Sequence, residues 1–181
     1  SRDPIDQYKY INVDDYKMWN LTSDNQVGYG NWNLAVGFSL IGVSQRIDTG
    51  AIGTSSDDKF LYTFNVNTAL SYQLPEARMQ FSLYYKYNGK TQQFESDISD
   101  SSQFVLAETA SYNWLDASVR KQFFDDQFEV MIGARNLLNI TDIRTTTGTG
   151  VGGSAHATTV NNIMLGYGRS YFLKLTYNLN F

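Results

Sequence analysis

The stretch Tyr171-Phe-Leu-Lys-Leu-Thr-Tyr-Asn-Leu-Asn-Phe181 decides the fold class of this 181-residue chain. Successive side chains of a β-strand point to opposite faces of the sheet. In a strand over these residues, one face is therefore apolar with aromatic rings at both ends, whereas the other face is mostly polar. The apolar face carries Tyr171, Leu173, Leu175, Tyr177, Leu179 and Phe181, and the other face carries Phe172, Lys174, Thr176, Asn178 and Asn180. The pattern predicts an amphipathic strand that ends on an aromatic residue.

The same alternation recurs in four earlier segments, namely residues 32–40, 60–72, 79–87 and 128–134. Across these segments and the final strand, the apolar face carries no charge, because Lys86, Glu129 and Lys174 fall on the opposite face. A Lys or Arg facing lipid costs about 2–4 kcal/mol at the bilayer midplane. A strand of ~11 residues rising ~3.3 Å each and tilted by ~45° spans roughly 25 Å, the height of a membrane barrel's apolar band. The pattern therefore favours strands that face hydrocarbon on one side.

Two further segments alternate less regularly. Residues 8–22 contain an apparent slip of phase, which a β-bulge would explain. Residues 104–124 have the pattern of a long strand whose later part points Leu115, Ala117 and Val119 outward and Asp116, Ser118 and Arg120 inward. Tyr112 and Trp114 lie on the polar parity, which predicts a bulge or an extension beyond the membrane in this segment.

The connections between these strands alternate in length. Short, turn-like links are Tyr29–Asn31, Leu74–Ala77 and Asp125–Gln127, and long polar links are residues 46–59, 89–103 and 139–166. Short turns on one rim and long loops on the other are typical of outer-membrane barrels. The sequence thus predicts an all-β protein, a transmembrane antiparallel β-barrel fragment of about seven strands over residues 1–181. Because bacterial single-chain barrels have an even number of strands, we expect a piece of a larger barrel.

Composition excludes several classes of function. The chain has no cysteine, so neither a disulfide nor a thiolate metal site can form. Its net charge of −4 argues against nucleic acid as a partner. His156 is the single histidine, so no histidine-based metal cluster and no Ser/His/Asp triad can form within the chain. We therefore expect no enzyme activity and no cofactor.

Three stretches, with Phe181 at the end, resemble TonB-dependent outer-membrane receptors. Phe128-Glu-Val-Met-Ile-Gly-Ala-Arg-Asn-Leu-Leu-Asn139 resembles their penultimate strand, in which a Gly-x-x-Asn-Leu-Leu/Phe-Asn/Asp run is common. Gly168-Arg-Ser-Tyr171 resembles the start of their closing strand. Tyr8-Lys-Tyr-Ile-Asn-Val-Asp14 resembles a strand opening found in these receptors, especially those of Bacteroides-like bacteria. The resemblance covers nearly the whole chain.

The resemblance implies a 22-stranded barrel of the Gram-negative outer membrane, plugged by an N-terminal domain, of which this chain supplies the C-terminal part. It implies energy-coupled uptake of a large scarce nutrient such as cobalamin, haem or an iron-siderophore, with a glycan as a weaker candidate. The partners implied are membrane lipid, the rest of the barrel and its plug, the inner-membrane TonB-type transducer and the barrel-assembly machinery. A surface lipoprotein is a further candidate partner.

The resemblance also assigns roles to particular residues. The final stripe (Tyr171, Leu173, Leu175, Tyr177, Leu179 and Phe181) would be the signal that the assembly machinery recognises. Arg144 and His156, in the long 139–166 link, are candidate substrate contacts, and a loop histidine can bind haem iron. The inward polar side chains, which would touch a plug or substrate, are Asn65, Asn67, Gln80, Lys86, Asp116, Arg120, Glu129, Arg135 and Lys174.

Two other classes of function fit the same alternation. A passive porin-like barrel would share the strand pattern but would have no plug domain. A soluble β-sandwich that binds carbohydrate through aromatic side chains would also keep charge off its inner face.

Overall fold

A computed structural model describes residues 13–47, 60–96, 104–146 and 160–179. These residues form eleven β-strands and one short 3-10 turn, Pro75–Ala77. The strands are β1 Val13–Tyr29, β2 Trp32–Ile47, β3 Leu61–Leu74, β4 Met79–Asn88, β5 Thr91–Ser96, β6 Phe104–Thr109, β7 Tyr112–Phe123, β8 Phe128–Arg135, β9 Asp142–Thr146, β10 Val160–Met164 and β11 Ser170–Tyr177. The all-β class predicted from the sequence is confirmed. Among the described residues, no helix has both the length and the apolar character that crossing a bilayer requires.

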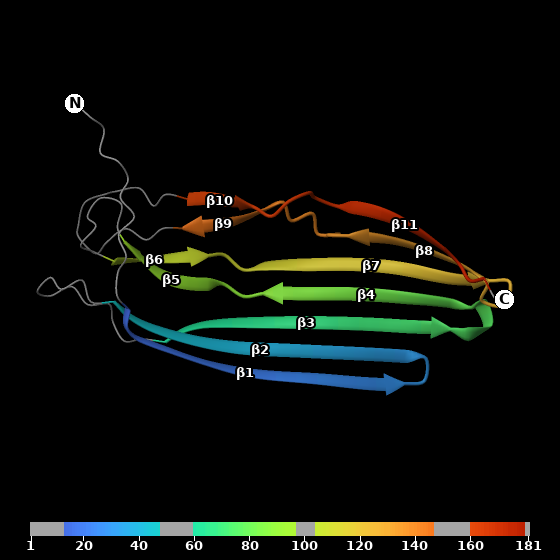
Figure 1. The fold of residues 1–181 in the computed structure, drawn as a ribbon, viewed down its shortest axis with the longest axis horizontal. Coiled ribbons are helices and arrows are strands. Elements are labelled where there is room, and N and C mark those ends of the chain that lie inside the picture. The colour runs from blue at the N-terminus through green and yellow to red at the C-terminus, as the bar shows by residue number, and fades with distance from the viewer. Residues whose placement is uncertain (1–12, 48–59, 97–103, 147–159, 180–181) are drawn as a thin grey trace, which may run out of the picture.

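Seven strands form one antiparallel sheet in the order β1-β2-β3-β4-β7-β8-β11 (Figure 1). Every neighbouring pair is antiparallel and follows chain order, so the sheet is a meander. The seven strands expected from hydrophobic alternation are the seven strands of this sheet. β1 and β11 are its two edges, and the sheet forms a single curved layer in Figure 1.

The three short links all lie at one end of the sheet, which we call the short-turn end (Figure 1). Gly30 has a φ of 56° in the link between β1 and β2, a conformation that glycine adopts without strain. The next link is the 3-10 turn closed by Arg78, and the third contains Phe124, Asp125 and Asp126 with positive φ. Arg78 Nη2 binds Asp125 Oδ1 at 2.8 Å and joins the last two turns. The hydrogen bond to Asp125 raises the pKa of Arg78 above its ordinary value.

Two of the long links are not irregular loops, contrary to the sequence-based expectation. They contain β5, β9 and β10, which form a four-stranded sheet with β6 in the order β10-β9-β6-β5 at the opposite end, the extended end (Figure 1). Two main-chain bonds continue the pairing of this sheet past its strand ends, from Ala110 N to Arg144 O at 2.8 Å and from Leu165 N to Thr141 O at 3.0 Å. The polar composition of these links suggested loops, but β-branched threonine, which occurs in β9 and β5, favours strands when a neighbouring strand is available.

The irregular segments have identifiable causes. The register between β1 and β2 shifts between Val13 and Asp15, within the segment 8–22 where a bulge was expected, but it is continuous from Asp15 to Tyr29, across the change of phase between Tyr16 and Trp19. The segment 104–124 is interrupted at residues 110–111, so its first part joins the four-stranded sheet and β7 starts at Tyr112. The closing strand ends at Tyr177, earlier than the predicted Phe181, although Asn178 N still binds Gln127 O at 2.8 Å.

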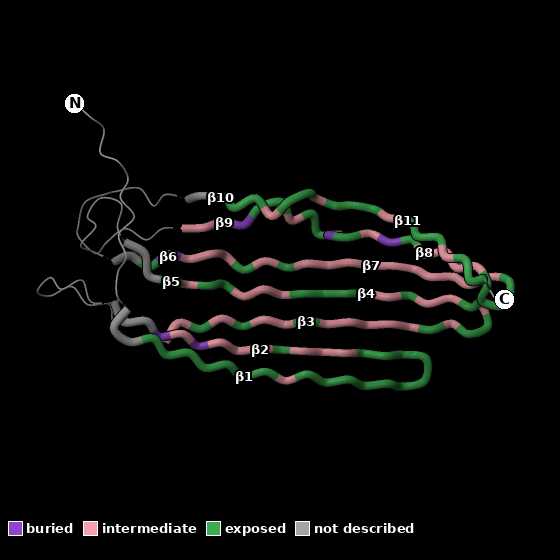
Figure 2. Tube along the Cα trace, viewed as in Figure 1, coloured by how far each residue is buried: buried purple, intermediate pink, exposed green. Residues whose placement is uncertain are grey.

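The seven-stranded sheet has an apolar face and a polar face, and the register places each predicted stripe on one of them. Figure 2 shows that the strands are mostly exposed or half-buried. The buried apolar side chains among the described residues, Ala107 and Ile143, lie in β6 and β9 of the four-stranded sheet. The apolar face of the larger sheet is therefore not covered by a second layer of the described chain.

Aromatic rings concentrate near both ends of the apolar face. Near the extended end, Trp19 contacts Tyr62 with ring centroids 5.8 Å apart. Near the short-turn end, the centroids of Trp32 and Tyr72 lie 4.5 Å apart. Phe64 and Tyr87 at 6.5 Å, and Phe123 and Phe128 at 6.2 Å, extend the two groups. We call these groups the two aromatic bands.

Candidate functional site on the polar face

The polar face brings together side chains from five strands in two adjacent rows across the sheet. One row is Asp24, Gly37, Asn67, Lys86 and Trp114, and the next is Gln26, Ala35, Ala69, Tyr84 and Asp116. Neighbours within each row are directly paired residues of adjacent strands, so their side chains share one face. The rows cross the middle of β3, at Asn67 and Ala69.

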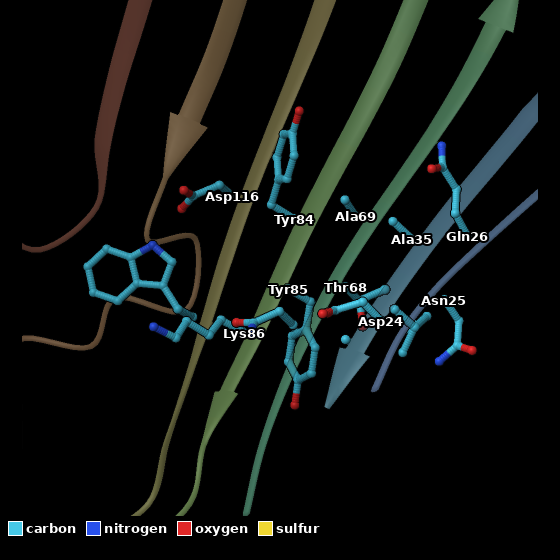
Figure 3. A pocket seen from close by; sticks show the side chains of 14 residues that line it. Asp24, Asn25, Gln26, Ala35, Thr68, Ala69, Tyr84, Tyr85, Lys86 and Asp116 are labelled. Carbon is cyan, nitrogen blue, oxygen red and sulfur yellow. The ribbon is translucent and has the colours of Figure 1, made fainter. Parts of the chain in front are cut away.

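These two rows form an open hollow of about 660 Å³, which we call the central hollow. Its floor consists of the small residues Ala35, Gly37 and Ala69, and longer side chains of β1, β4 and β7 surround it. Figure 3 shows Ala35 and Ala69 between the longer side chains of Gln26 and Tyr84. A Cβ at residue 37 would meet the Asp24 carboxylate oxygen, so a larger residue there would require the Asp24 side chain to move.

The central hollow combines charge, hydrogen-bonding groups and aromatic rings. Asp24 and Asp116 supply carboxylates, Lys86 supplies an ammonium group, and Tyr84 and Trp114 supply ring surface. Asp116 is held in place because its Oδ1 accepts a hydrogen bond from the main-chain N of Asn136 at 2.8 Å. Tyr84 is 53% exposed, so its ring is available to a ligand or to another segment of protein. The arrangement suits binding of a polar ligand or chain.

A second hollow of about 380 Å³ lies beside it over β4, β7, β8 and β11. Arg120 lies on its wall, bonded to Gln80 and to Glu129, whose Oε2 is 3.5 Å from Arg120 Nη1. Arg135 lies over the ring of Phe172, with 5.2 Å between the guanidinium carbon and the ring centroid. A guanidinium at this distance from an aromatic face is attracted to it, so the pair closes one side of the second hollow.

All nine inward polar residues predicted from the sequence lie on the polar face, as the strand registers show. Six of them line one of the two hollows: Asn67, Gln80, Lys86, Asp116, Arg120 and Arg135. Asn65 instead binds Ser39 Oγ and the main-chain N of Gly89. The structure thus brings most of this predicted set together.

The two loop candidates do not join this site. Arg144 is an exposed residue of β9, paired with Asn162 of β10, and lines neither hollow. His156 lies outside the described residues. Both remain predictions of substrate contact.

The closing stripe lies on the apolar face of the edge strand β11. Tyr171, Leu173, Leu175 and Tyr177 are paired with Ala134, Ile132, Val130 and Phe128 of β8, and each is at least 60% exposed. Leu179 follows the strand, and Phe181 lies outside the described residues. The recognition role of this stripe remains a prediction.

A cluster that sequence reasoning missed lies where the two quoted motifs meet. Asn136, 1% exposed, donates from its amide to Ile140 O at 2.8 Å and accepts from Ile140 N at 2.9 Å. Arg169 donates its main-chain N–H to Asn139 Oδ1 at 3.0 Å and its guanidinium to Leu137 O. We call Asn136, Asn139 and Arg169 the junction residues. All three residues belong to the receptor-like stretches at residues 128–139 and 168–171, and this shared membership is the signal in the sequence that could have pointed to them.

The residues that the structure describes contain no group of three or more His, Asp or Glu side chains suited to hold a metal ion. Comparisons with protein-family models, with curated proteins and with solved structures find no match to this chain.

Proposed function

We propose that this chain is the C-terminal part of a TonB-dependent outer-membrane transporter that takes up a large scarce nutrient by an energy-coupled mechanism. Its seven-stranded sheet would be one portion of the wall of a 22-stranded barrel. The polar face would line the lumen and the apolar face would contact lipid. The three quoted motifs and the geometry of the two faces support this proposal.

The spacing of the two aromatic bands is the observation that carries the membrane assignment. Tyr62 and Tyr72, which mark the two bands on β3, are ten residues apart. At ~3.3 Å per residue this separation is roughly 33 Å along the strand, or about 25 Å along the membrane normal at a tilt of ~40°. Outer-membrane barrels have an apolar band of about 25 Å between two aromatic girdles. The spacing is the one expected of a membrane wall.

The uncovered apolar face favours lipid over a soluble sandwich. Ile132, Leu173 and Leu175 are each about 60% exposed on this face. A soluble sandwich buries such side chains against a second sheet, and water would penalise leaving them exposed. Within the described residues, no second sheet covers them. A bilayer would cover them without any further protein layer.

The two edges of the sheet support the proposal that it forms only part of a barrel wall. β1 and β11 each have one side without a strand partner in the described chain. Hydrocarbon cannot satisfy such backbone N–H and C=O groups, so a membrane sheet must close on further strands. In a 22-stranded barrel, the missing strands would pair with both edges, and an N-terminal plug would fill the lumen.

The polar face supports a plugged lumen that handles a large polar substrate. The central hollow and the second hollow offer carboxylates, guanidinium groups and aromatic rings to a plug or a substrate. Cobalamin, haem and iron-siderophores are the proposed substrate class, with a glycan as second choice. A passive porin would present a similar wall without energy coupling.

The orientation of the wall can be tested by spin labelling of the complete protein after any cysteine outside residues 1–181 is replaced by serine, because these residues contain none. Leu70 on the apolar face and its neighbour Ala69 on the polar face would each be changed to cysteine in the complete protein and labelled. We expect the label at position 70 to collide mainly with lipid-soluble oxygen, and the label at 69 mainly with a water-soluble nickel complex. Equal exposure of both labels to the nickel complex would contradict a lipid-facing wall.

Uptake assays test the transport step. Cells producing the complete protein would be given radiolabelled cobalamin, haem, a ferric siderophore or an oligosaccharide, with and without an uncoupler of the proton gradient. We expect accumulation of one of these substrates that the uncoupler abolishes. Uptake that is insensitive to the uncoupler would instead favour a passive pore.

A further inference from the structure

We propose that the apolar face holds one glycerophospholipid at a defined site, with an acyl chain in a groove over β4, β7, β8 and β11 and the headgroup phosphate beside Lys121. The inference rests on the proposed membrane location of the sheet. It goes further by naming the ligand class and the residues that bind it.

The groove is a depression of about 520 Å³ on the apolar face, and we call it the acyl groove. Its floor is formed by Ala117 of β7 and Ala134 of β8, which are directly paired in the register. The larger side chains around this floor are those of Trp32, Leu70, Tyr72, Phe81, Leu83, Val119, Ile132 and Tyr171. Two adjacent alanines among aromatic and branched side chains leave a channel that is apolar and suits a hydrocarbon chain.

A single cation stands at the short-turn end of the acyl groove. The register places Lys121 on the same face as Ala117 and Val119, between Met79 of β4 and Val130 of β8. On β3, β4, β7, β8 and β11, Lys121 is the one charged side chain that the described registers place on the apolar face. Lys121 lies in the less regular segment 104–124, outside the five stripes that the sequence predicted to be free of charge.

The direction of the Lys121 side chain fits a headgroup. Its Nζ lies 5.4 Å from the ring centroid of Phe123, two residues nearer the short-turn end. A lysine on a membrane face extends its ammonium toward the polar interface and leaves its methylenes against apolar neighbours. Within the described part of the chain, no carboxylate pairs with Lys121, whereas Arg78 at the same end is paired with Asp125. The ammonium is thus available to a phosphate.

A phospholipid satisfies both halves of the site. The acyl groove requires a hydrocarbon chain, and the cation at its end requires an anionic group at the depth of the headgroups. A non-ionic detergent would fill the groove without offering an anion, and a free fatty acid would offer a single-chain carboxylate in place of the phosphate. A free phosphate would contact Lys121 without filling the groove.

Native mass spectrometry of the complete protein, released from detergent micelles, can measure this binding. The probes are phosphatidylglycerol and diacylglycerol with identical acyl chains, so that they differ only in the phosphate-bearing headgroup. We expect phosphatidylglycerol to bind about fivefold more tightly than diacylglycerol, because one lysine near an anionic lipid contributes about that much. Lys121→Gln should abolish this difference and leave diacylglycerol binding unchanged. Equal binding of both lipids by the parent protein would overturn the role of Lys121.

The groove itself is tested by Ala117→Leu, which fills its floor. We expect both lipids to bind about tenfold more weakly, roughly the effect of two acyl methylenes losing contact. Val66→Leu is the matched control, because it adds carbon to the same face outside the acyl groove. If the Ala117→Leu variant binds both lipids as tightly as the parent protein, the groove is not the binding site of the acyl chain. Heat-modifiable gel mobility would confirm that each variant is folded.

The failure of this inference and the failure of the proposed function are distinguishable. The lipid competition is measured on purified protein and does not depend on uptake. Equal binding of phosphatidylglycerol and diacylglycerol by a protein that fractionates with the outer membrane would refute the lipid site and leave the proposed function standing. A protein absent from the membrane fraction would contradict the proposed function, whatever its lipid binding.

Discussion

Arg169 binds the main-chain carbonyl oxygen of Leu137 through two guanidinium nitrogens, Nε at 3.1 Å and Nη2 at 2.7 Å. Leu137 follows β8 and Arg169 directly precedes β11, so this contact joins the two strands where their pairing begins. Leu137 N in turn binds Leu115 O of β7 at 2.7 Å. The segment between β8 and β9 is thereby fastened on both sides. These contacts give a physical reason for the Arg-Asn-Leu-Leu-Asn stretch at 135–139 to occur together with the Gly-Arg stretch at 168–169.

Replacing Arg169 by lysine should lower the free energy of unfolding by about 1 kcal/mol, because an ammonium cannot reproduce the two-nitrogen contact and the site is exposed. Denaturant unfolding of the complete protein in lipid vesicles measures the effect. Arg144→Lys is the control, since this exposed arginine of β9 should be replaced with little change. Similar losses from both variants would show that the contact to Leu137 contributes nothing specific.

Asn136→Ala should cost about 2–4 kcal/mol, because it leaves both main-chain groups of Ile140 unpaired at a buried site. Asn136 also has a φ of 53°, a conformation that asparagine tolerates better than alanine. Asn136→Gly should therefore be less damaging than Asn136→Ala. Asn162→Ala, which removes an exposed bond to Asp142, should cost less than 1 kcal/mol by the same unfolding assay. A loss for Asn136→Ala no larger than this would contradict the structural role of the junction.

Gly133→Ala should destabilise the sheet by about 1–3 kcal/mol through overpacking. A Cβ at position 133 would overlap the ring of Phe172 and lie 3.0 Å from Ala117 O. Phe172→Ala should recover most of that loss when combined with Gly133→Ala, because the ring is the main obstacle. A double-mutant cycle on the free energies of unfolding measures the coupling. Strictly additive losses would mean that the backbone of β7, rather than Phe172, limits the space.

Val66→Arg should destabilise the wall by about 2–4 kcal/mol, whereas Asn67→Arg should cost much less. Val66 lies on the apolar face between Phe38 and Tyr87, and Asn67 lies on the polar face between Gly37 and Lys86. The measurement is the amount of assembled protein in the outer membrane together with its stability in vesicles. A larger loss for Asn67→Arg would mean that the lumen and lipid faces have been assigned the wrong way round.

The sequence alone determined the seven strands of the larger sheet, their faces and the positions of the short turns. Side-chain alternation with a period of two is a local property, so residues 60–72 or 79–87 reveal their apolar stripe without any knowledge of their neighbours. Turn signals such as Tyr29-Gly-Asn and Leu74-Pro are equally local, and they separate the strands at the observed places. Antiparallel neighbours follow, because short turns join consecutive strands only in that way.

Only the tertiary structure decided which residues of different strands meet. The central hollow exists because Ala35 and Ala69 fall in one row across the sheet, and that row depends on the register between strands. Strand register is set by pairing over long sequence separations, as is the contact between Leu137 and Arg169. The strands within the long 89–103 and 139–166 links were missed for the same reason, because β5 becomes a strand by pairing with β6, and β9 and β10 by pairing with each other. Local sequence patterns specify the faces of each strand, but the sites on those faces form only when the strands are assembled side by side.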